Sequence, residues 1–560
     1  MSEDASRIDE TPDHAGAYPR LSGAQVQLLV AHGVTRSTAE GEVLYQEGDD
    51  LSDFYVVLSG KVAVVQNIGR AERLVAVHGA GRFLGELNLL AGQPMLLSAV
   101  VRGAGEVVAI PLDRLREVVS QQPAIGDLVL RAMLIRRSLQ IEIGAGLCIL
   151  GSRYSSDSRR LRAFVARNRI PCTWIDLERD SGAEALLREL GVAPDETPVV
   201  VWHGEQVLRN PSNATLAQVI RLGHDVSGGE RLDLIVVGAG PAGLAAAVYG
   251  ASEGLASVVV EAVATGGQAA TSPLIENYLG FPLGISGAEL ADRAGLQTEK
   301  FGARITVPAR AFRLEHDGGH HVVATDSGET LTAPALIIAT GAAYRRLEVP
   351  GIDRFEGTSV YHAATEIEAH LCRGDPVAVV GGGNSAGQAT VFLARYAGQV
   401  SLLVRHGDLG RDMSRYLVDR VERTPGVEVF LNTEVRELVG SGSLEAMVIA
   451  DLLTGDTMRL DARALFVFIG AMPFTEWLRG AVELDDHGFV RTGGAVGSYD
   501  EPGPDGGAAR PLETSRPGIF AAGDVRSGSV KRVAAAVGEG AMAVRFVHEY
   551  LAEVGRNSSG

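Results

Sequence analysis

A glycine-rich turn between two apolar segments constrains the fold of this 560-residue chain more than any other feature. The β-branched run Leu234–Val237 has the composition of a buried strand, and it leads directly into the motif GAGPAG. Gly238 allows a tight strand-to-helix turn, Gly240 lets the backbone approach a pyrophosphate at the helix N-terminus, and Gly243 lets the helix pack against the strands. The pattern predicts a dinucleotide-binding site.

A carboxylate follows the second strand of the same segment. The alanine-rich helical pattern leads to a strand, Ser257–Val260, that ends at Glu261. This acid lies about twenty residues beyond the glycines, where dinucleotide-binding domains place a carboxylate on the ribose hydroxyls. A transmembrane helix is the competing interpretation, because Leu234–Ser252 carries no charge. Several glycines and a proline inside that window disfavour a membrane span, and the order strand, turn, helix, strand, acid disfavours a chance glycine turn.

The composition is that of a globular protein, with 46% hydrophobic and 21% charged residues. The length predicts about three or four domains. A net charge of −18 disfavours nucleic acid or an anionic membrane as the main partner. Residues 1–20 are acidic and lack an apolar core, which predicts a flexible tail rather than a signal peptide. With three cysteines and no export signal, we expect a cytoplasmic protein.

Residues 21–142 have the pattern of a small β-domain. Segment 40–65 alternates apolar and polar residues at strand period, and its glycines fall between the runs. Segment 107–119 ends the strands and begins a helix. The turn glycines Gly41, Gly48 and Gly60 are placed as in the cyclic-nucleotide-binding β-roll, which this region resembles.

The ligand of that β-roll is a separate question. Residues Gly85–Leu90 resemble the start of the phosphate cassette, in which the glutamate accepts from the ribose and an arginine after the cassette proline pairs with the cyclic phosphate. Here Pro94 is followed by Met95, and no arginine occurs until Arg102. A thioether cannot replace a bidentate cationic donor. A ligand-free oligomerisation or regulatory module is therefore favoured over a cyclic-nucleotide receptor.

Residues 143–224 predict the order strand, helix, strand, helix, strand, strand, helix. This order resembles a thioredoxin- or glutaredoxin-like domain, with Thr197-Pro198 at that family's cis-proline. The family carries Cys-x-x-Cys at the start of the first helix, where the helix dipole lowers a thiol pKa. The chain has YSSDS at 154–158 instead, and Cys148 and Cys172 fall within strands as packed core thiols. We expect an adaptor domain without redox activity.

A second fingerprint occupies residues 376–405, where strand, glycine turn, helix and strand recur. Its second strand ends in Arg405 rather than in an acid. An acid suits a free ribose hydroxyl, whereas an arginine suits a 2′-phosphate. Arg405, with His406 or Arg411, therefore points to NADPH over NADH. A solvated basic strand end is the alternative interpretation.

The two fingerprints occur together with GGQ at 266–268, ENYLGFP at 276–282, ATGA at 339–342 and GIFAAGDVR at 518–526. Together they resemble the bacterial low-molecular-weight thioredoxin reductase family over about residues 231–555. The resemblance implies a fold of two nested Rossmann-like domains and a homodimer. FAD would bind a domain built from residues 231–350 and 474–555, and NADPH would bind the inserted residues 351–473. The expected fold class is therefore multidomain α/β and β, with the β-roll and the thioredoxin-like domain preceding the nested pair.

Matched motif by motif, the resemblance implies two sets of cofactor contacts and no metal site. FAD would contact Gly238, Gly240, Pro241, Ala242, Gly243, Glu261, Thr265, Gly266, Gly267, Gln268, Asn277, Thr340, Gly341, Gly523, Asp524, Lys531, Arg532, Val533 and Ala534. NADPH would contact Gly381, Gly383, Asn384, Ser385, Ala386, Arg405, His406 and Arg411. A helix starting near Lys531 would direct its N-terminal amides at the first nucleotide site.

One departure from the family concerns the path of the electrons. The family carries Cys-Ala-Thr-Cys-Asp-Gly shortly before the second fingerprint, whereas the corresponding stretch here, 361–370, has no cysteine. Cys372 stands alone, and one thiol without a partner cannot cycle as an intramolecular dithiol. We interpret Cys372 as a structural core cysteine.

The first functional hypothesis is an NADPH-dependent FAD oxidoreductase. Hydride passes from NADPH to FAD, and the electrons leave to an unidentified acceptor: a quinone, dioxygen, a carrier such as ferredoxin, or a disulfide on a redox partner protein. Hydride transfer needs no protein acid or base, so no catalytic side chain is assigned. The second hypothesis is a flavin-bound regulatory sensor or scaffold with little turnover. Retention of both nucleotide motifs favours the enzyme, and loss of both dithiols and of the cassette arginine favours the sensor. Disulfide reduction by Cys372 with an outside thiol is the third and least favoured hypothesis.

Overall fold

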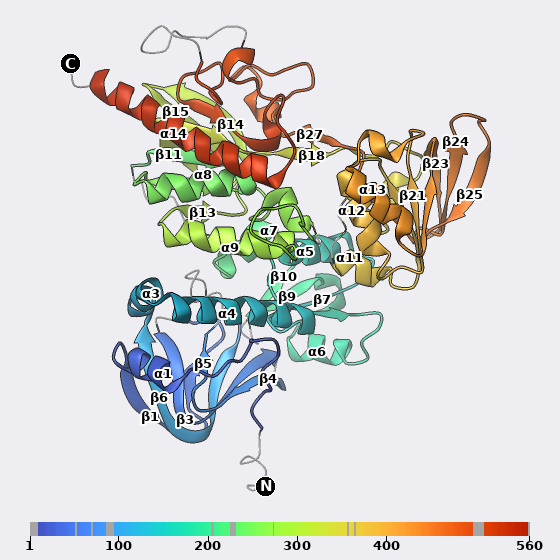
Figure 1. Cartoon of the computed structure of the whole chain (residues 1–560). Helices are drawn as coiled ribbons and strands as arrows, with labels where there is room; N and C mark the ends of the chain where they lie inside the picture. Colours follow the sequence, from blue (N-terminus) through green and yellow to red (C-terminus); the bar gives the residue numbers. More distant parts are fainter. Residues whose placement is uncertain are drawn as a thin grey trace. The chain divides into compact units, whose positions relative to one another are not determined.

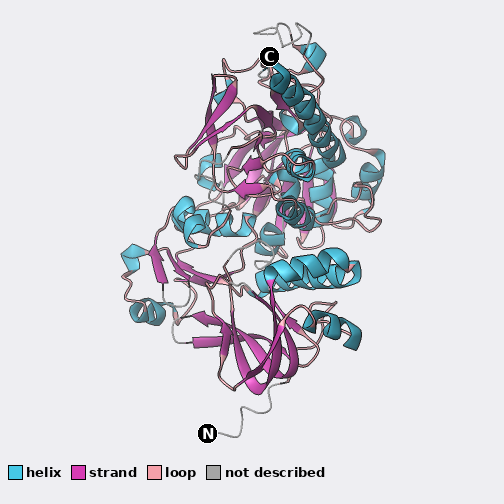
Figure 2. Cartoon of the chain, turned by 90° about the vertical axis from the view of Figure 1, so that its left-hand side faces the viewer, coloured by secondary structure: helices cyan, strands magenta, loops and turns pink. Residues whose placement is uncertain are grey.

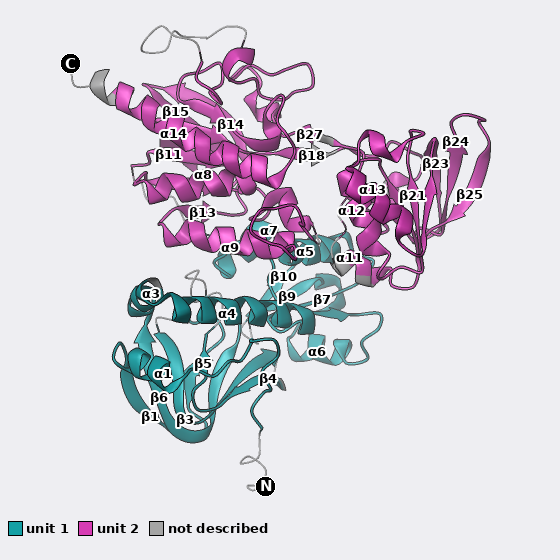
Figure 3. Ribbon diagram, viewed as in Figure 1, with its two compact units in different colours: residues 1–224 teal, residues 225–560 magenta. Residues whose placement is uncertain are grey.

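The computed structural model describes residues 9–50, 53–68, 71–85, 94–202, 206–223, 231–272, 274–355, 358–362, 364, 366–496 and 509–557 (Figure 1). The chain divides into two compact units, residues 1–224 and residues 225–560 (Figure 3). Each unit has its own layers and its own buried core.

The first part of unit 1 is a strongly curved antiparallel sheet, visible as the magenta ribbons near the N-terminus in Figure 2. Its two long strands, β3 and β6, pair along most of their length, and shorter strands extend the edges. This is the β-roll expected from the sequence. Its elements are α1 (Gly23–Val30), β1 (Val34–Thr38), β2 (Val43–Tyr45), β3 (Asp53–Ile68), β4 (Ala71–His78), β5 (Phe83–Leu84), β6 (Ser98–Pro111), α3 (Leu112–Gln121) and α4 (Pro123–Ile143). Residues 86–93 of the compared cassette lie outside the described part.

The N-terminal segment from residue 9 to residue 20 is not part of a flexible tail, although its acidic composition predicted one. From residue 9 onward it runs along the β-roll, with Ala17 and Tyr18 only 0% and 8% exposed. The carbonyl of Ala17 accepts a hydrogen bond from Nε of Arg136 on α4 at 2.7 Å. The acidic composition did not predict this packing, because one small residue and one aromatic residue, Ala17 and Tyr18, are enough to anchor a short segment.

The second part of unit 1 is a four-stranded mixed sheet in the order β10-β9-β7-β8, as a thioredoxin-like domain requires. The Thr197-Pro198 bond is cis, as the resemblance implied. Cys148 is buried in β7 and Cys172 is half-buried in β8, where burial raises the pKa of Cys172 to about 12. The β-roll and this sheet share one continuous apolar core, which includes Tyr18 and Trp202. The elements are β7 (Leu147–Gly151), α5 (Ser156–Arg167), β8 (Cys172–Asp176), α6 (Ala183–Glu189), β9 (Val199–Trp202), β10 (Gln206–Arg209) and α7 (Asn213–Val219).

The first domain of unit 2 is built around a five-stranded parallel sheet in the order β13-β12-β11-β17-β28. Helices α8 and α14 pack on it, and a Cβ at Gly540 would lie 2.1 Å from the carbonyl oxygen of Ala242, so glycine is needed where these helices meet. The elements before the second domain are β11 (Leu234–Val237), α8 (Pro241–Ser252), β12 (Ser257–Val260), α9 (Gly287–Lys300), β13 (Arg304–Thr306), β14 (Ala311–Asp317), β15 (His320–Thr325), β16 (Thr330–Ala333), β17 (Ala335–Ile338) and β18 (Ala342–Tyr344). After the second domain come β28 (Ile519–Ala521) and α14 (Val533–Asn557).

The second domain of unit 2 repeats this plan with the parallel sheet β19-β26-β20-β21-β22 and a separate antiparallel sheet β23-β24-β25. Its elements are α10 (Ile352–Phe355), β19 (Val360–Tyr361), α11 (Glu366–Leu371), β20 (Pro376–Val380), α12 (Asn384–Leu393), β21 (Gln399–Leu403), α13 (Arg415–Arg423), β22 (Val427–Phe430), β23 (Thr433–Val439), β24 (Ala446–Asp451), β25 (Thr457–Asp461) and β26 (Ala464–Val467).

The two places where the chain crosses between these domains lie together. Strand β18 pairs antiparallel with β27 (Ala471–Pro473), so both crossings form one short ladder. Pro350, at the predicted boundary between residues 231–350 and 351–473, is tied to the second domain, since its carbonyl accepts from the amide of Leu438 at 3.2 Å. Across the described residues, no helix is long and apolar enough to span a bilayer.

Candidate functional site

The carboxyl edge of the first parallel sheet gathers most of the residues expected to hold FAD. Gly238 follows β11 with φ of 109°, and a Cβ there would meet the carbonyl oxygen of Ala339 at 2.3 Å. Gly243 is equally constrained, because its Cβ would lie 1.8 Å from the carbonyl oxygen of Gly238. A Cβ at Gly240 would meet nothing within 4 Å. The first and third glycines therefore close the turn, and the second leaves open space at the N-terminus of α8, as a bound pyrophosphate needs.

Glu261 lies at the end of β12, beside this turn, and is 9% exposed. One carboxylate oxygen accepts from the amide of Ala239 at 2.8 Å, and the other accepts from the amides of Val263 and Ala264 at 2.8 and 3.3 Å. Burial raises the pKa of the Glu261 carboxyl, and these amide donors oppose the rise. The carboxylate is thus fixed in orientation by one amide of the glycine turn and two amides of the segment after β12.

The GGQ segment folds over the same edge. The amide of Gly266 donates to the carbonyl of Ala239 at 2.7 Å, and a Cβ at Gly267 would lie 3.0 Å from Cα of Gly240. The side-chain amide of Gln268 donates to the carbonyl of Ala342, which ends the ATGA turn. Thr340 in that turn donates to the carbonyl of Phe474 at 3.2 Å. Segments from both halves of the first domain therefore meet at one edge of the sheet.

The C-terminal part of the chain adds the turn around Asp524. Gly523 follows β28, and burial raises the pKa of the Asp524 carboxyl while nearby Lys531 lowers it. Helix α14 begins at Val533, close to the expected start, with Lys531 and Arg532 exposed before it. Nζ of Lys531 lies 5.0 Å from the ring centroid of Phe489.

Asn277, another of the expected FAD contacts, makes no hydrogen bond to the two glycine-turn segments among those described above. It is exposed on a loop whose neck is the bridge between Ile275 and Ile285. Its neighbour Glu276 pairs with Arg420 of the second domain at 2.5 Å.

The second fingerprint forms the same kind of turn at the end of β20. Gly381 has φ of 143°, and its Cβ would meet the carbonyl oxygen of Phe468 at 2.3 Å. At Gly383, which caps α12, a Cβ would meet only the carbonyl oxygen of Asp412, at 3.9 Å. Ala386 is buried against the sheet, Ser385 is exposed in the first helical turn, and Asn384 accepts from the amide of Ser414 at 2.8 Å. The open position again lies at a helix N-terminus.

The basic residues expected at this second turn do gather beyond β21. Nδ1 of His406 lies 3.1 Å from a guanidinium nitrogen of Arg411. Arg405 is 67% exposed and pairs with Glu434 at 3.5 Å. A 2′-phosphate could be met by all three, but it would compete with Glu434 for Arg405.

Cys372 is the single cysteine of unit 2 in the sequence. It lies just after α11, is 5% exposed, and its thiol donates to the carbonyl of Glu368 at 2.9 Å. Burial raises the pKa of this thiol to about 11. A protonated, enclosed thiol is a poor nucleophile.

The sequence interpretation missed Glu539 and Glu434, which contact expected site residues from distant parts of the chain. Glu539 on α14 accepts from the amide of Gly523 at 2.7 Å and pairs with Arg526 at 2.5 Å, which fixes the turn before Asp524. The acid flanked by glycines in the motif GEG was the available signal. Glu434 carried no such signal, because only the folded sheet brings it to Arg405. In the described part of the chain, no group of three His, Cys, Asp or Glu side chains is arranged to hold a metal.

Residues 232–540, which contain both turns, match the family model of the pyridine nucleotide-disulphide oxidoreductases. The chain belongs to this family. Residues 35–122 of the β-roll match the model of the cyclic nucleotide-binding domain.

Family members of similar sequence support this membership. A thioredoxin reductase of Mycolicibacterium smegmatis is 35% identical over 322 residues, which are 57% of this chain and 97% of that protein. A 34.2 kDa protein in the rubredoxin operon of Clostridium pasteurianum is 32% identical over 58% of this chain and 98% of its own length. The crystal structure of Lactococcus lactis thioredoxin reductase in its FR conformation is 26% identical with a TM-score of 0.52, over 58% of this chain and all of that one. Unit 2 is therefore a thioredoxin reductase-like oxidoreductase, joined to a cyclic nucleotide-binding-type domain.

Proposed function

We propose that this chain is an NADPH-dependent flavoprotein oxidoreductase that passes electrons to an acceptor outside its own thiols. The observation that carries the proposal is the pair of glycine turns, each open at a helix N-terminus, in one unit. One turn has the buried acid Glu261 beside it, and the other has the basic residues Arg405, His406 and Arg411. These residue types suit an unphosphorylated ribose in the first turn and a 2′-phosphate in the second.

The residues fit FAD at the first glycine turn and NADPH at the second. The amides at the start of α8 would meet the pyrophosphate of FAD, and Glu261 would accept from its adenosine ribose. The fixed turn around Asp524 and the start of α14 would hold the other end of the cofactor. Bound FAD supplies the hydride acceptor and the electron store, which no side chain provides.

The position of Cys372 supports an acceptor beyond the chain. Its thiol is buried, protonated at neutral pH and alone in unit 2, whereas an internal disulfide relay needs two adjacent thiols. The two other cysteines lie in strands of unit 1. The relative from a rubredoxin operon makes small electron-carrier proteins a reasonable first class of acceptor to test, followed by quinones, dioxygen and partner disulfides.

Rapid mixing under anaerobic conditions tests the proposal. We expect NADPH to bleach the flavin absorbance of the FAD-loaded protein within seconds, and NADH to do so more slowly. Reoxidation by one of these acceptors, unchanged in Cys372→Ser, supports an oxidoreductase without an internal thiol relay. Absence of bleaching by either nucleotide would instead support a flavin-bound sensor.

A further inference from the structure

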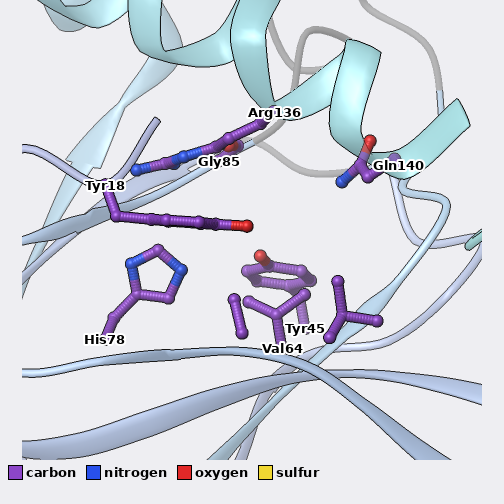
Figure 4. Close-up of a pocket in the computed structure, with 9 residues that line it drawn as sticks. Tyr18, Tyr45, Val64, His78, Gly85, Arg136 and Gln140 are labelled. Carbon is purple, nitrogen blue, oxygen red and sulfur yellow. The ribbon is translucent and has the colours of Figure 1, made fainter. Parts of the chain in front are cut away.

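The β-roll of unit 1 encloses a cavity whose contents the family match leaves open. It is lined by Tyr18, Tyr45, Val64, Val75, Ala76, His78, Gly85, Arg136 and Gln140 (Figure 4). Gly85 opens the segment that resembles the phosphate cassette, so this cavity corresponds to the ligand site of the cyclic nucleotide-binding domain. Its free volume is about 20 Å³, which is room for one water molecule.

Tyr18 is the lining residue that the N-terminal segment contributes. Its ring lies between two buried groups, with the guanidinium carbon of Arg136 5.4 Å from the ring centroid and the ring of His78 edge-on at 5.5 Å. Figure 4 shows the Tyr18 ring between them, with its hydroxyl directed into the remaining space. Burial raises the pKa of the Tyr18 phenol and holds the pKa of His78 well below its usual range. Both side chains are therefore neutral at physiological pH.

The backbone on either side of Tyr18 is tied to the roll. The amide of Thr11 donates to the carbonyl of Val77 at 3.1 Å, and the amide of Val77 donates back to the Thr11 hydroxyl at 2.8 Å. The amide of Leu21 donates to the carbonyl of Gly81 at 2.7 Å. On α4, Arg136 donates both to the carbonyl of Ala17 at 2.7 Å and to that of Gly85 at 3.1 Å. One arginine thus joins the N-terminal segment, the cassette start and the helix.

The segment also brings its own anion. The carboxylate of Glu10 lies 3.7 Å from Nε of the buried Arg82. A Cβ at Gly79 would come within 1.9 Å of that carboxylate, so glycine at this position leaves the space that Glu10 occupies. Glu10, which also pairs with Arg20 of the same segment, therefore adds a second attachment of the segment to the roll, outside the lining of the cavity.

We propose that residues 9–21 are the resident occupant of the β-roll's ligand cavity, with Tyr18 as its anchor, and that they exclude cyclic nucleotides from it. A cavity for a ligand of nucleotide size needs on the order of 300 Å³ or more, far beyond the space that remains. Met95, which follows Pro94 and is fully buried, stands where the resemblance places the arginine that pairs with the cyclic phosphate. A cyclic nucleotide would therefore gain no ion pair at this position by displacing the segment.

A cavity-rescue experiment on the full chain tests the occupant. Tyr18→Ala should lower the melting temperature of unit 1 by roughly 6–15 °C, the usual result of removing a buried aromatic ring from a domain of this size. Millimolar phenol, which is the group that this substitution removes, should recover part of this loss. It should have no effect on the wild type or on the matched variant Tyr154→Ala, whose side chain is 72% exposed. A Tyr18→Ala protein that melts like the wild type, or that gains nothing from phenol, would overturn the proposal.

A titration of the wild type is independent of how the variant folds. Calorimetry with cyclic AMP and cyclic GMP up to about 1 mM should detect no binding. Saturable binding of either nucleotide in the micromolar range would show that the segment does not hold the cavity, and would overturn the proposal directly.

Discussion

The carboxylate of Glu261 accepts hydrogen bonds from three backbone amides at the first nucleotide turn and after β12. We therefore expect both the charge and the shape of this side chain to affect FAD binding. Replacement by glutamine keeps the shape but directs an NH₂ group at one or more of these amides. We expect Glu261→Gln to weaken FAD binding about 10-fold or more, since an unsatisfied buried donor costs about 1–3 kcal/mol. Flavin fluorescence on titration of the apoprotein measures this change. Glu253→Gln, an exposed acid just after α8, should bind FAD like the wild type, and equal losses in the two variants would argue against a specific role.

Arg405 is predicted to select NADPH although it pairs with Glu434 in the structure. We expect Arg405→Gln to raise the KM for NADPH about 5- to 20-fold and to leave the KM for NADH unchanged, since a charged hydrogen bond at an exposed position is worth about 1–2 kcal/mol. Steady-state kinetics with both nucleotides measures the split. The control is Arg459→Gln, an arginine of similar exposure on β25. An equal rise for NADH would mean that Arg405 does not read the 2′-phosphate.

His321 gives unit 2 a defined dependence on pH. Its side chain is 1% exposed, and burial lowers its pKa to about 3, with His316, Arg516 and His320 adding to this effect. Between about pH 6.5 and 3 the unfolded chain binds a proton at this position that the folded chain does not. The free energy of unfolding therefore falls as the pH drops, by about 2–3 kcal/mol at pH 4.5. Urea unfolding at pH 7 and pH 4.5 should show a smaller acid loss in His321→Gln than in the wild type or in the exposed-site control His487→Gln. Identical losses in all three would refute the assignment.

At the residue scale, the sequence predicted the glycine turns, because the residues that form each turn follow one another in the chain. Gly238, Gly240 and Gly381 were predictable because a strand, a tight turn and a helix follow one another without a break. Glu539 and Tyr18 were not, since each acts on residues far away in sequence: Glu539 on Gly523, and Tyr18 on the cavity beneath Arg136. Local patterns carry no information on such distant contacts.

At the scale of elements, the sequence predicted the strand, helix and strand at each glycine turn, because β-branched runs alternate with helical patterns. The two nested Rossmann-like domains were implied by the family resemblance. The antiparallel link between β18 and β27 was not predicted, since each strand has only three residues and no periodicity. Besides this ladder, the ion pair between Arg420 on α13 and Glu276 joins the two domains of unit 2. A movement that separates α13 from that loop must break the pair.

This contact predicts a salt-sensitive effect on flavin reduction. Hydride transfer requires the two nucleotides to meet, and where the movement that brings them together separates α13 from the Glu276 loop, the ion pair opposes it. Arg420→Gln should then increase the rate of flavin reduction by NADPH up to about 5-fold at low ionic strength, because a partly exposed pair contributes about 0.2–1 kcal/mol. The gain should disappear in high salt, where the wild-type pair is already screened. Stopped-flow traces at two salt concentrations measure it, with Arg423→Gln on the same helix as the control. A slower reduction in Arg420→Gln would show that the pair supports the productive arrangement instead.

At the scale of the whole molecule, two units with separate cores are expected to unfold in two cooperative steps. A ligand that binds only the folded form stabilises it by RT ln(1 + [L]/Kd), about 2.7 kcal/mol at a hundredfold excess over Kd. FAD should therefore raise only the transition of unit 2, by several degrees in scanning calorimetry, and Glu261→Gln should abolish most of that shift. Tyr18→Ala should lower only the other transition. A single transition that responds to both FAD and Tyr18→Ala would mean that the β-roll, the thioredoxin-like sheet and the nucleotide domains are energetically coupled. The β-roll could then influence flavin chemistry through stability alone, without binding any nucleotide.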